Sequence, residues 1–216
     1  MKRRVFSTTA ALGAVSIGNL PLLAHAQVKK PEEGGEYLSL EKRVAVEAPT
    51  GKVEVIEFFW YSCPHCNAFE PALEAWIKGV PKDVFIKRVP VAFRDDFVPQ
   101  QRLYYTLEAM GKVDELHRKV FNAIHVEKLA LNTLPTISAW IEKQGVDRTK
   151  FTDLYNSFSV STKATRAKQL QDAYKVDGVP ALGVAGRFYT SGSLAASMDR
   201  ALQVVDFLIA EVRKGR

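Results

Sequence analysis

The hydrophobic pattern along the chain changes from strand-like to helix-like and back again. Residues Val53–Trp60 form an apolar run that is typical of a buried strand. Asn67–Ile77 then has the pattern of a helix, and Val84–Val91 has that of a second buried strand. Further upstream, Tyr37–Val46 is predicted to form a first strand at the edge of the sheet.

From Phe93 to about Lys175 the apolar side chains recur at helical spacing. Proline residues in first turns and glycine residues just past the ends mark several helix boundaries. Five helices are predicted in this block: Pro99–Met110, Val113–His125, Pro135–Gln144, Lys150–Phe158 and Ser161–Tyr174.

Strand patterns return after this helical block. Val179–Ala185 and Arg187–Thr190 flank Gly186, which is predicted to occupy a hairpin turn. Leu194–Arg213 is predicted to form a last amphipathic helix.

This order of elements predicts a small α/β domain that is divided by a helical insertion. Residues 27–92 and 176–216 are assigned to the α/β domain, and residues 93–175 to the α-helical insertion domain. The chain has 216 residues, of which 47% are hydrophobic and 25% are charged, as in ordinary globular proteins. It is long enough to bury a core without disulfide bridges.

Residues 1–26 have the pattern of an export signal that is cleaved before Gln27. A basic start is followed by an apolar stretch and by the small-x-small sequence Ala24-His25-Ala26. An N-terminal helix of the fold is the alternative, which the breakers Gly13, Gly18, Asn19 and Pro21 disfavour. The pair Arg3-Arg4 leaves both general and twin-arginine export open.

The charge of the chain argues against nucleic acid as a partner. The formal net charge is +6, and the signal removes Lys2, Arg3 and Arg4 but no acid, which leaves +3. The remaining basic residues are scattered, whereas nucleic-acid-binding proteins gather them on one face.

The chemistry of the chain centres on its two cysteines, Cys63 and Cys66, which are separated by Pro64 and His65. A Cys-x-x-Cys motif between a strand and a helix indicates thiol–disulfide redox chemistry. An exported protein sits where disulfides persist, yet a bridge that closes so short a loop adds little stability. The pair is therefore better suited to act as a reagent than as a structural bridge.

Zinc is the structural alternative for the cysteines. A closed zinc site takes four Cys or His ligands, and the chain has no second Cys-x-x-Cys motif. Besides His65, the mature chain offers only His117 and His125, which are predicted in a distant helix. No metal and no bound cofactor are therefore expected, and the redox group is the Cys63–Cys66 pair itself.

The motif also gives the two cysteines different roles. Pro64 suits the first position of a helix, which puts Cys63 at or just before the helix start, exposed and beside unpaired N–H groups. Cys66 falls in the first turn and faces inward. We expect a lowered pKa for Cys63, which His65 lowers further, and an ordinary or raised pKa for Cys66. A stabilised thiolate leaves readily, so the disulfide form is expected to be an oxidant.

Glu57 is unusual because it lies in the apolar run Val53–Trp60. An acid buried there requires a raised pKa or a cationic partner, and Lys87 and Arg88 on the next predicted strand are candidates. The functional hypothesis is that Glu57 accepts a proton from Cys66 during exchange. The alternative is an acid at the margin of the sheet that faces water.

Three features of the chain occur together: the sequence Phe58-Phe59-Trp60-Tyr61-Ser62 followed by Cys63-Pro64-His65-Cys66, the helical insertion, and the sequence Gly178-Val179-Pro180-Ala181. In this combination the chain resembles the DsbA family of thiol–disulfide oxidoreductases. The resemblance covers essentially the whole mature chain. It implies a thioredoxin-like fold interrupted by an α-helical insertion domain, and a location in the bacterial periplasm.

The resemblance also implies roles for individual residues. Cys63 matches the nucleophilic cysteine of the family, and Cys66 the buried one. Pro180 matches a cis-proline that faces the cysteines, and the backbone of Val179 would pair with a substrate peptide. Glu57 matches a buried glutamate, although the lysine that usually accompanies it is Arg88 in this chain.

The predicted function is therefore the transfer of the Cys63–Cys66 disulfide to folding exported proteins through a mixed disulfide at Cys63. Family analogy implies reoxidation by a quinone-linked membrane protein of the DsbB type, and we expect a monomer. A disulfide isomerase, an oxidoreductase for a single client and a non-catalytic peptide-binding or chaperone module are the alternatives. Periplasmic disulfide isomerases, by family analogy, carry a dimerisation domain before the redox domain. The isomerase is disfavoured because the segment before the first buried strand, Gln27–Lys52, is too short for such a domain.

Overall fold

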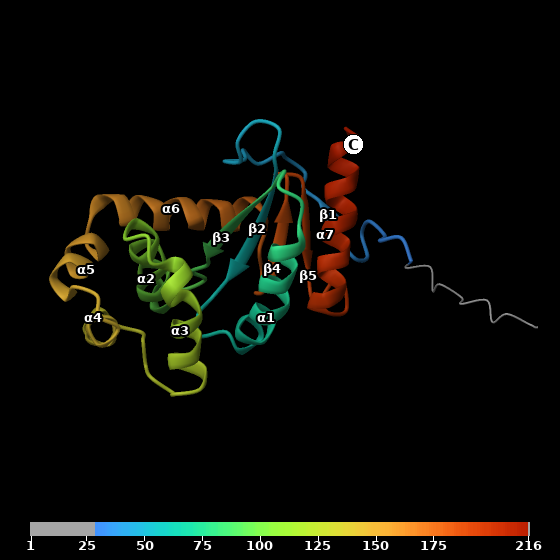
Figure 1. Cartoon of the computed structure of the whole chain (residues 1–216). Coiled ribbons are helices and arrows are strands. Elements are labelled where there is room, and N and C mark those ends of the chain that lie inside the picture. Colours follow the sequence, from blue (N-terminus) through green and yellow to red (C-terminus); the bar gives the residue numbers. More distant parts are fainter. Residues whose placement is uncertain (1–28, 216) are drawn as a thin grey trace, which may run out of the picture.

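A mixed β-sheet forms the centre of the computed structural model, which describes residues 29–215 (Figure 1). Within those residues the sheet has five strands in the order β1-β5-β4-β2-β3. Only β2 and β3 run parallel; the other neighbours are antiparallel. The strands are β1 Leu38–Ser39, β2 Val53–Phe59, β3 Val84–Pro90, β4 Ala181–Val184 and β5 Phe188–Ser191.

The seven residues of strand β2 are all buried. It pairs with β3 from Val53 opposite Val84 to Phe59 opposite Pro90, and with β4 on its other side. A strand that is covered on both faces is expected to be almost continuously apolar. Parallel strands cannot be joined by a tight turn, and helix α1, Pro64–Gly79, makes the connection between β2 and β3.

Helices cover both faces of the sheet. Val53 and Val55 of β2 belong to a cluster that includes Leu73 of α1 and Leu208 of α7, Met198–Arg213. The alternating residues Ile56 and Phe58 belong to a second cluster, on the side of the helical insertion. This alternation follows from the two-residue repeat of a strand.

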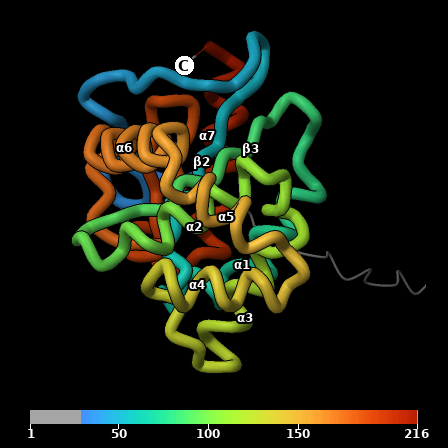
Figure 2. Tube along the Cα trace, turned by 90° about the vertical axis from the view of Figure 1, so that its left-hand side faces the viewer, coloured from blue at the N-terminus to red at the C-terminus, as the bar shows by residue number. Residues whose placement is uncertain are grey.

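The helical elements between β3 and β4 gather on one side of the sheet, to the left in Figure 1 and in front in Figure 2. They are the short 3₁₀ helix η1 Asp95–Phe97 and the helices α2 Val98–Ala109, α3 Val113–His125, α4 Leu134–Lys143, α5 Arg148–Tyr155 and α6 Phe158–Ala173. Hydroxyl or carboxylate side chains cap α4, α5 and α6 at Thr133, Asp147 and Ser157. No helix within residues 29–215 combines the length and the apolar character needed to cross a bilayer.

The predicted helices agree with the observed ones to within a few residues, and α3 agrees at both ends. The edge strand predicted over Tyr37–Val46 is wrong in extent, because only Leu38 and Ser39 form a regular strand. Beyond it, single hydrogen bonds from Leu40 N to Arg187 O and from Val44 N to Gly186 O hold the segment to the sheet.

The starts of the last helix and of β4 also differ from the prediction. The last helix begins at Met198 rather than Leu194, because the Ser197 side chain caps it. Strand β4 begins at Ala181 rather than Val179, after a proline that has no N–H to donate. The predicted export signal, residues 1–26, lies outside the described residues.

Substitution of Gly186 by alanine should destabilise the fold. Ala185 and Gly186 have φ of 53° and 64°, as the hairpin turn between β4 and β5 requires. A Cβ on Gly186 would also overlap the carbonyl group of Val44. A left-handed conformation alone costs about 1–2 kcal/mol, so Gly186→Ala should lower the free energy of unfolding by about 2 kcal/mol or more, measured by urea denaturation.

Gly79→Ala is the matched control for this substitution. Gly79 ends α1, has no positive φ, and has open space where a Cβ would stand. This variant should be as stable as the wild type or slightly more stable. Equal stability of the two variants would contradict the assigned role of the Gly186 turn.

Candidate active site

The two cysteines lie where the chain passes from β2 into α1. Helix α1 begins at Pro64, so Cys63 is its N-cap residue, and its extended backbone has φ −78° and ψ 118°. The first N–H groups of a helix have no partner within it and carry partial positive charge. Cys63 therefore stands at the positive end of α1, as predicted, and Cys66 lies in the first turn.

Both cysteines are free thiols in this structure, and both side chains are buried. The complete burial of Cys66 agrees with the expectation that it faces inward. The expectation that Cys63 is exposed was wrong, since only 7% of this residue is accessible. Its sulfur lies against the loop that precedes β4, where Cys63 Sγ–H donates a hydrogen bond of 3.3 Å to the Val179 carbonyl oxygen.

The same loop contains a cis peptide bond between Val179 and Pro180, an isomer that the sequence alone does not reveal. A cleft of about 280 Å³ borders the loop, and its lining includes His65, Val179, Pro180 and Met198. The structure thus brings three residues that the sequence singles out, His65, Val179 and Pro180, to one cleft beside Cys63. We call it the cis-proline cleft.

The two thiols have opposite electrostatic environments. The pKa of Cys63 is lowered to about 6. The largest effect is a hydrogen bond from the Cys66 thiol, and smaller lowering effects come from the backbone N–H groups of Cys66 and His65 and from the charge of His65, whereas burial acts to raise the pKa. Burial raises the pKa of Cys66, and the adjacent Cys63 raises it further. These directions match the sequence-based prediction, and the contribution of the Cys66 thiol is an addition to it.

Glu57 is buried within β2, with 1% of its side chain accessible. Arg88 lies opposite it on β3, and Arg88 Nη1 is 2.9 Å from Glu57 Oε2. Burial raises the pKa of Glu57 to about 8 although Arg88 acts to lower it. The alternative that this acid faces water at the sheet margin is wrong. Of the two candidate partners, Lys87 pairs with Glu47 instead, at 2.8 Å.

Sequence reasoning missed two further members of this charged group, Glu70 and His117. Arg88 Nη1 lies 2.5 Å from Glu70 Oε1 and 2.6 Å from His117 Nε2. The other ring nitrogen, His117 Nδ1, is 2.9 Å from the hydroxyl of Tyr61. We call Glu57, Glu70, Arg88 and His117 the buried charge cluster. The helical position of Glu70, four residues after Cys66 on α1, was the one signal that could have indicated it.

Known proteins share the sequence pattern and the fold of this chain. Residues 86–203 match the family model of the DSBA-like thioredoxin domain. A thiol:disulfide interchange protein DsbA from Burkholderia cepacia is 43% identical over 199 residues, which cover 92% of this chain and 94% of that protein. The chain belongs to the DsbA-like family.

Other relatives agree with this assignment. The DsbA protein of Bordetella pertussis is 44% identical over 207 residues, covering 95% of this chain and 97% of the relative. A crystal structure of Pseudomonas aeruginosa DsbA superposes with a TM-score of 0.81, at 38% identity, covering 86% of this chain and 96% of that one. The DsbA resemblance and the thioredoxin-like fold interrupted by an α-helical insertion are thereby confirmed.

In this DsbA-like chain the helical insertion holds the segment that leads to Cys63. The Ser62 backbone N–H donates to Gln100 Oε1 at 3.1 Å, and Gln100 Nε2 donates to the Ser62 hydroxyl at 2.7 Å. His125 Nε2 donates to the Tyr61 carbonyl oxygen at 2.8 Å, and the Trp60 ring stacks on Phe97 with centroids 3.8 Å apart. Helices α2 and α3 therefore position the residues just before the cysteine.

His117 and His125, which the zinc alternative would need, both contact Tyr61 rather than the cysteines. Within residues 29–215 no group of three or more His, Cys, Asp or Glu side chains has the proximity needed to hold a metal ion.

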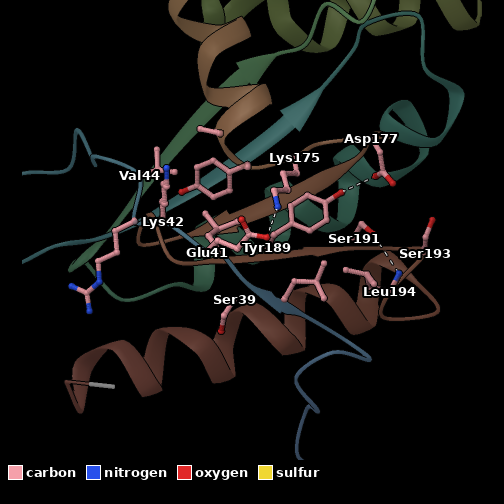
Figure 3. Close-up of a pocket in the computed structure, with 15 residues that line it drawn as sticks. Ser39, Glu41, Lys42, Val44, Lys175, Asp177, Tyr189, Ser191, Ser193 and Leu194 are labelled. Atoms are coloured by element: carbon pink, nitrogen blue, oxygen red, sulfur yellow. Dashed lines mark hydrogen bonds and ion pairs between the residues drawn. The ribbon is translucent and has the colours of Figure 1, made fainter.

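A larger cavity of about 660 Å³ lies next to the cis-proline cleft, between residues 38–44 and the end of α6 (Figure 3). Asp177 and Tyr189 line both spaces, and the Tyr189 hydroxyl donates to Asp177 at 3.4 Å. Glu41 and Lys175 form an ion pair of 2.7 Å in its wall. Neither space is lined by a cysteine. The lining of the cis-proline cleft, however, includes His65 and Val179, and the Val179 carbonyl contacts Cys63 Sγ, so this cleft is the candidate for binding near the reactive sulfur.

The pH dependence of alkylation should separate the two thiols. The rate at which iodoacetamide modifies the reduced protein should follow a single titration with a midpoint near pH 6, because the pKa of Cys63 is about 6. Mass spectrometry should place the label on Cys63 and leave Cys66 unmodified. A midpoint near the value of about 8.5 for free cysteine would contradict this assignment.

Proposed function

We propose that the protein donates the Cys63–Cys66 disulfide to reduced, exported polypeptides through a mixed disulfide at Cys63. Membership of the DsbA-like family supports the general activity, thiol–disulfide oxidoreductase. The observation that carries the more specific proposal is the contrast between the thiols. Cys63 lies at the start of α1 with a lowered pKa and beside a cleft, whereas Cys66 is fully buried with a raised pKa.

The reaction follows from this contrast. A substrate thiolate attacks Cys63 Sγ of the disulfide, the Cys63–Cys66 bond breaks, and its electron pair leaves on Cys66, which takes up a proton. A second substrate thiolate then attacks the substrate sulfur of the mixed disulfide, and Cys63 leaves as a thiolate. The substrate gains one disulfide and the enzyme becomes a dithiol. A leaving thiolate of low pKa departs faster and favours this direction.

Glu57 handles the proton of the buried cysteine in this scheme. Its charge contributes to raising the pKa of Cys66, so the two groups influence each other. With a pKa of about 8, Glu57 can give a proton to Cys66 when substrate is oxidised. It can accept that proton again when Cys66 attacks during reoxidation. A catalytic acid or base is most effective when its pKa lies near the working pH.

The cis-proline cleft is proposed to hold the substrate backbone next to Cys63. In the dithiol form the Val179 carbonyl accepts the hydrogen of the Cys63 thiol. The Cys63 thiolate and a mixed disulfide at Cys63 both lack this hydrogen, so in these forms the carbonyl can accept a backbone N–H of the substrate, as in strand addition. Val179 and Pro180 would thus recognise backbone rather than side chains, which suits substrates of varied sequence.

The setting of the reaction is proposed from the sequence and the family. The pattern of residues 1–26 supports export, and the relatives support a periplasmic location and reoxidation by a membrane protein of the DsbB type. No cofactor besides the cysteine pair is required, because the disulfide itself is the two-electron oxidant, and we expect the protein to work as a monomer.

Trapping experiments should assign the two cysteines. Cys66→Ser, incubated with a single-cysteine peptide that is activated as a mixed disulfide with thionitrobenzoate, should accumulate a covalent one-to-one adduct. Cys63 attacks the peptide sulfur, thionitrobenzoate leaves with the electron pair, and neither the variant nor the peptide has a second thiol that could resolve the adduct. Cys63→Ser should form none. The wild-type disulfide form should oxidise a reduced peptide that contains two cysteines. Intact mass spectrometry under acid quench measures all three, and an adduct on Cys63→Ser would contradict the assigned roles of the two cysteines. Full function of Cys63→Ser would favour a peptide-binding or chaperone module.

Glu57→Gln should slow exchange without weakening the fold. The substitution keeps the shape of the side chain but removes its proton exchange, so reoxidation of the dithiol form by glutathione disulfide should slow by roughly 10²-fold or more. Tryptophan fluorescence can follow the reaction. An unchanged rate would exclude Glu57 as the proton acceptor.

The stability of the same variant has a predictable dependence on pH. Burial raises the pKa of Glu57 to about 8 in the folded protein, whereas an unfolded glutamate titrates near about 4.3. The contribution of Glu57 to the free energy of unfolding of the wild type is therefore fully present below about pH 4.3, and it is lost as the pH rises to about 8. Across this range Glu57→Gln should gain stability relative to the wild type. A constant difference would show that Glu57 is not titrating in this way.

A further inference from the structure

One nitrogen atom, Arg88 Nη1, is at the centre of the buried charge cluster. It lies 2.9 Å from Glu57 Oε2, 2.5 Å from Glu70 Oε1 and 2.6 Å from His117 Nε2. This nitrogen carries only two hydrogens, so three acceptors compete for two hydrogen bonds. The arrangement depends on whether His117 Nε2 acts as an acceptor or carries a proton.

Each protonation state of His117 has its own set of partners. Neutral His117 carries its hydrogen on Nδ1, which faces the Tyr61 hydroxyl at 2.9 Å, and accepts from Arg88 through Nε2. Protonated His117 instead donates from Nε2 to Glu70 Oε1, at 3.2 Å. The ring can therefore take either state with hydrogen-bond partners at both nitrogens.

The charges of the cluster do not balance without an additional proton. Glu57 and Glu70 supply two negative charges and Arg88 supplies one positive charge, within side chains of which no more than 13% is accessible. An uncompensated charge in such surroundings is costly. Neutrality requires one further proton, and the groups that can hold it are Glu57 and His117, because the contacts of Glu70 with His117 and Arg88 keep its pKa low.

We propose that Glu57 and His117 share a single proton, so that His117 is a positioning residue that compensates the charge of Glu57 whenever Glu57 is ionised. The inference rests on the proposed role of Glu57 in exchange. At neutral pH the proton resides on Glu57, whose pKa is raised to about 8, while burial lowers the pKa of His117. When Glu57 gives its proton to Cys66, His117 takes up one from water and restores neutrality.

A surface cavity gives His117 the access to water that Glu57 lacks. The cavity has a volume of about 490 Å³, and its lining includes Arg88 and His117. Glu57 does not line it and is 1% exposed. Proton exchange between the cluster and solvent can therefore occur at the imidazole of His117, on the side of β3 and α3.

Other titratable and charged groups surround the pair. Glu74 on α1 raises the pKa of both Glu57 and His117, and it lies 3.9 Å from Arg118 of α3. The remaining titratable or charged groups that face the cluster or line the cavity are Cys66, Lys78, Tyr61, Tyr104 and Asp114. Glu74 is the carboxylate best suited as a control, because it lies nearby but makes no contact with Arg88 Nη1.

The direct test is a titration of His117 by NMR. The full-length protein is used in its disulfide form, in which no thiol titrates, and the ¹⁵N shifts of the imidazole are followed from pH 4 to 10. In the wild type the His117 shifts should show a step near pH 8, where Glu57 ionises, besides the titration of the ring itself. Glu57→Gln should abolish that step, and Glu74→Gln should retain it. Superimposable His117 curves for the wild type and Glu57→Gln would overturn the proposal.

Kinetics supply a second test. His117→Gln keeps hydrogen-bonding groups but cannot carry the proton, so ionised Glu57 stays uncompensated. The rate of reoxidation by glutathione disulfide should show a pH midpoint that is absent from Glu57→Gln and therefore belongs to Glu57. In His117→Gln this midpoint should shift upward by about one pH unit. An unshifted midpoint, or a fall in rate that is equal at every pH, would overturn the proposal.

The two tests also separate the shared proton from the proposed function. The NMR titration needs no turnover, and it can be carried out even if His117→Gln fails to fold. Absence of peptide oxidation by the wild-type protein would contradict the proposed function, whereas coupling between His117 and Glu57 would still be measured. If the wild-type protein oxidises the peptide but the His117 titration does not depend on Glu57, only the proposal of a shared proton is contradicted.

Discussion

The antiparallel pairing of β2 with β4 is the constraint on which the site depends. Phe58, near the end of β2, lies opposite Ala181, at the start of β4. The segment that follows β2 and the loop that precedes β4 therefore meet at one edge of the sheet. Cys63 and the Val179–Pro180 bond face each other there although 116 positions separate Cys63 from Val179. This pairing brings the Cys63 thiol next to its backbone partner, the Val179 carbonyl.

The second organising feature is the different depth of the two sulfurs in α1. A helix presents its unpaired N–H groups at its first turn, and Cys63 as the N-cap lies beside them. Cys66 falls on the buried face of α1. The same local geometry thus stabilises one thiolate and disfavours the other. This asymmetry arises from the spacing of the two cysteines and one helix boundary, and the proposed direction of disulfide transfer rests on it.

Two strands and two helices together supply a small, buried charged group. Glu57 comes from β2, Arg88 from β3, Glu70 from α1 and His117 from α3. Burial makes each ionisation in this group depend on the others, so their protonation is a property of the cluster rather than of one residue. The helical insertion therefore does more than cover the sheet, because it supplies the imidazole and also holds the residues before Cys63 through Gln100 and His125.

Sequence alone determined much of this protein. The apolar run of β2, the helical spacing between β3 and β4, and Pro64 at the first position of α1 are local patterns, and each predicts its element because it reflects burial or backbone geometry nearby. Local patterns also predicted that the pKa of Cys63 is lower than that of Cys66, and that an acid lies in a buried strand. Even the choice of Arg88 as a candidate partner followed from adjacent strands.

What the tertiary structure decided concerns contacts between distant segments. The way in which residues 38–44 and the loop before β4 pack against the sheet determines three features. They are the short extent of β1, the burial of Cys63 and the cis bond before Pro180. The selection of Arg88 over Lys87 depends on the register and facing of β3. His117 looked like an isolated histidine in a remote helix, because no local pattern shows that α3 packs beside α1. Periodicity reports which face of an element is buried, whereas the identity of its neighbour is settled only when the elements pack together.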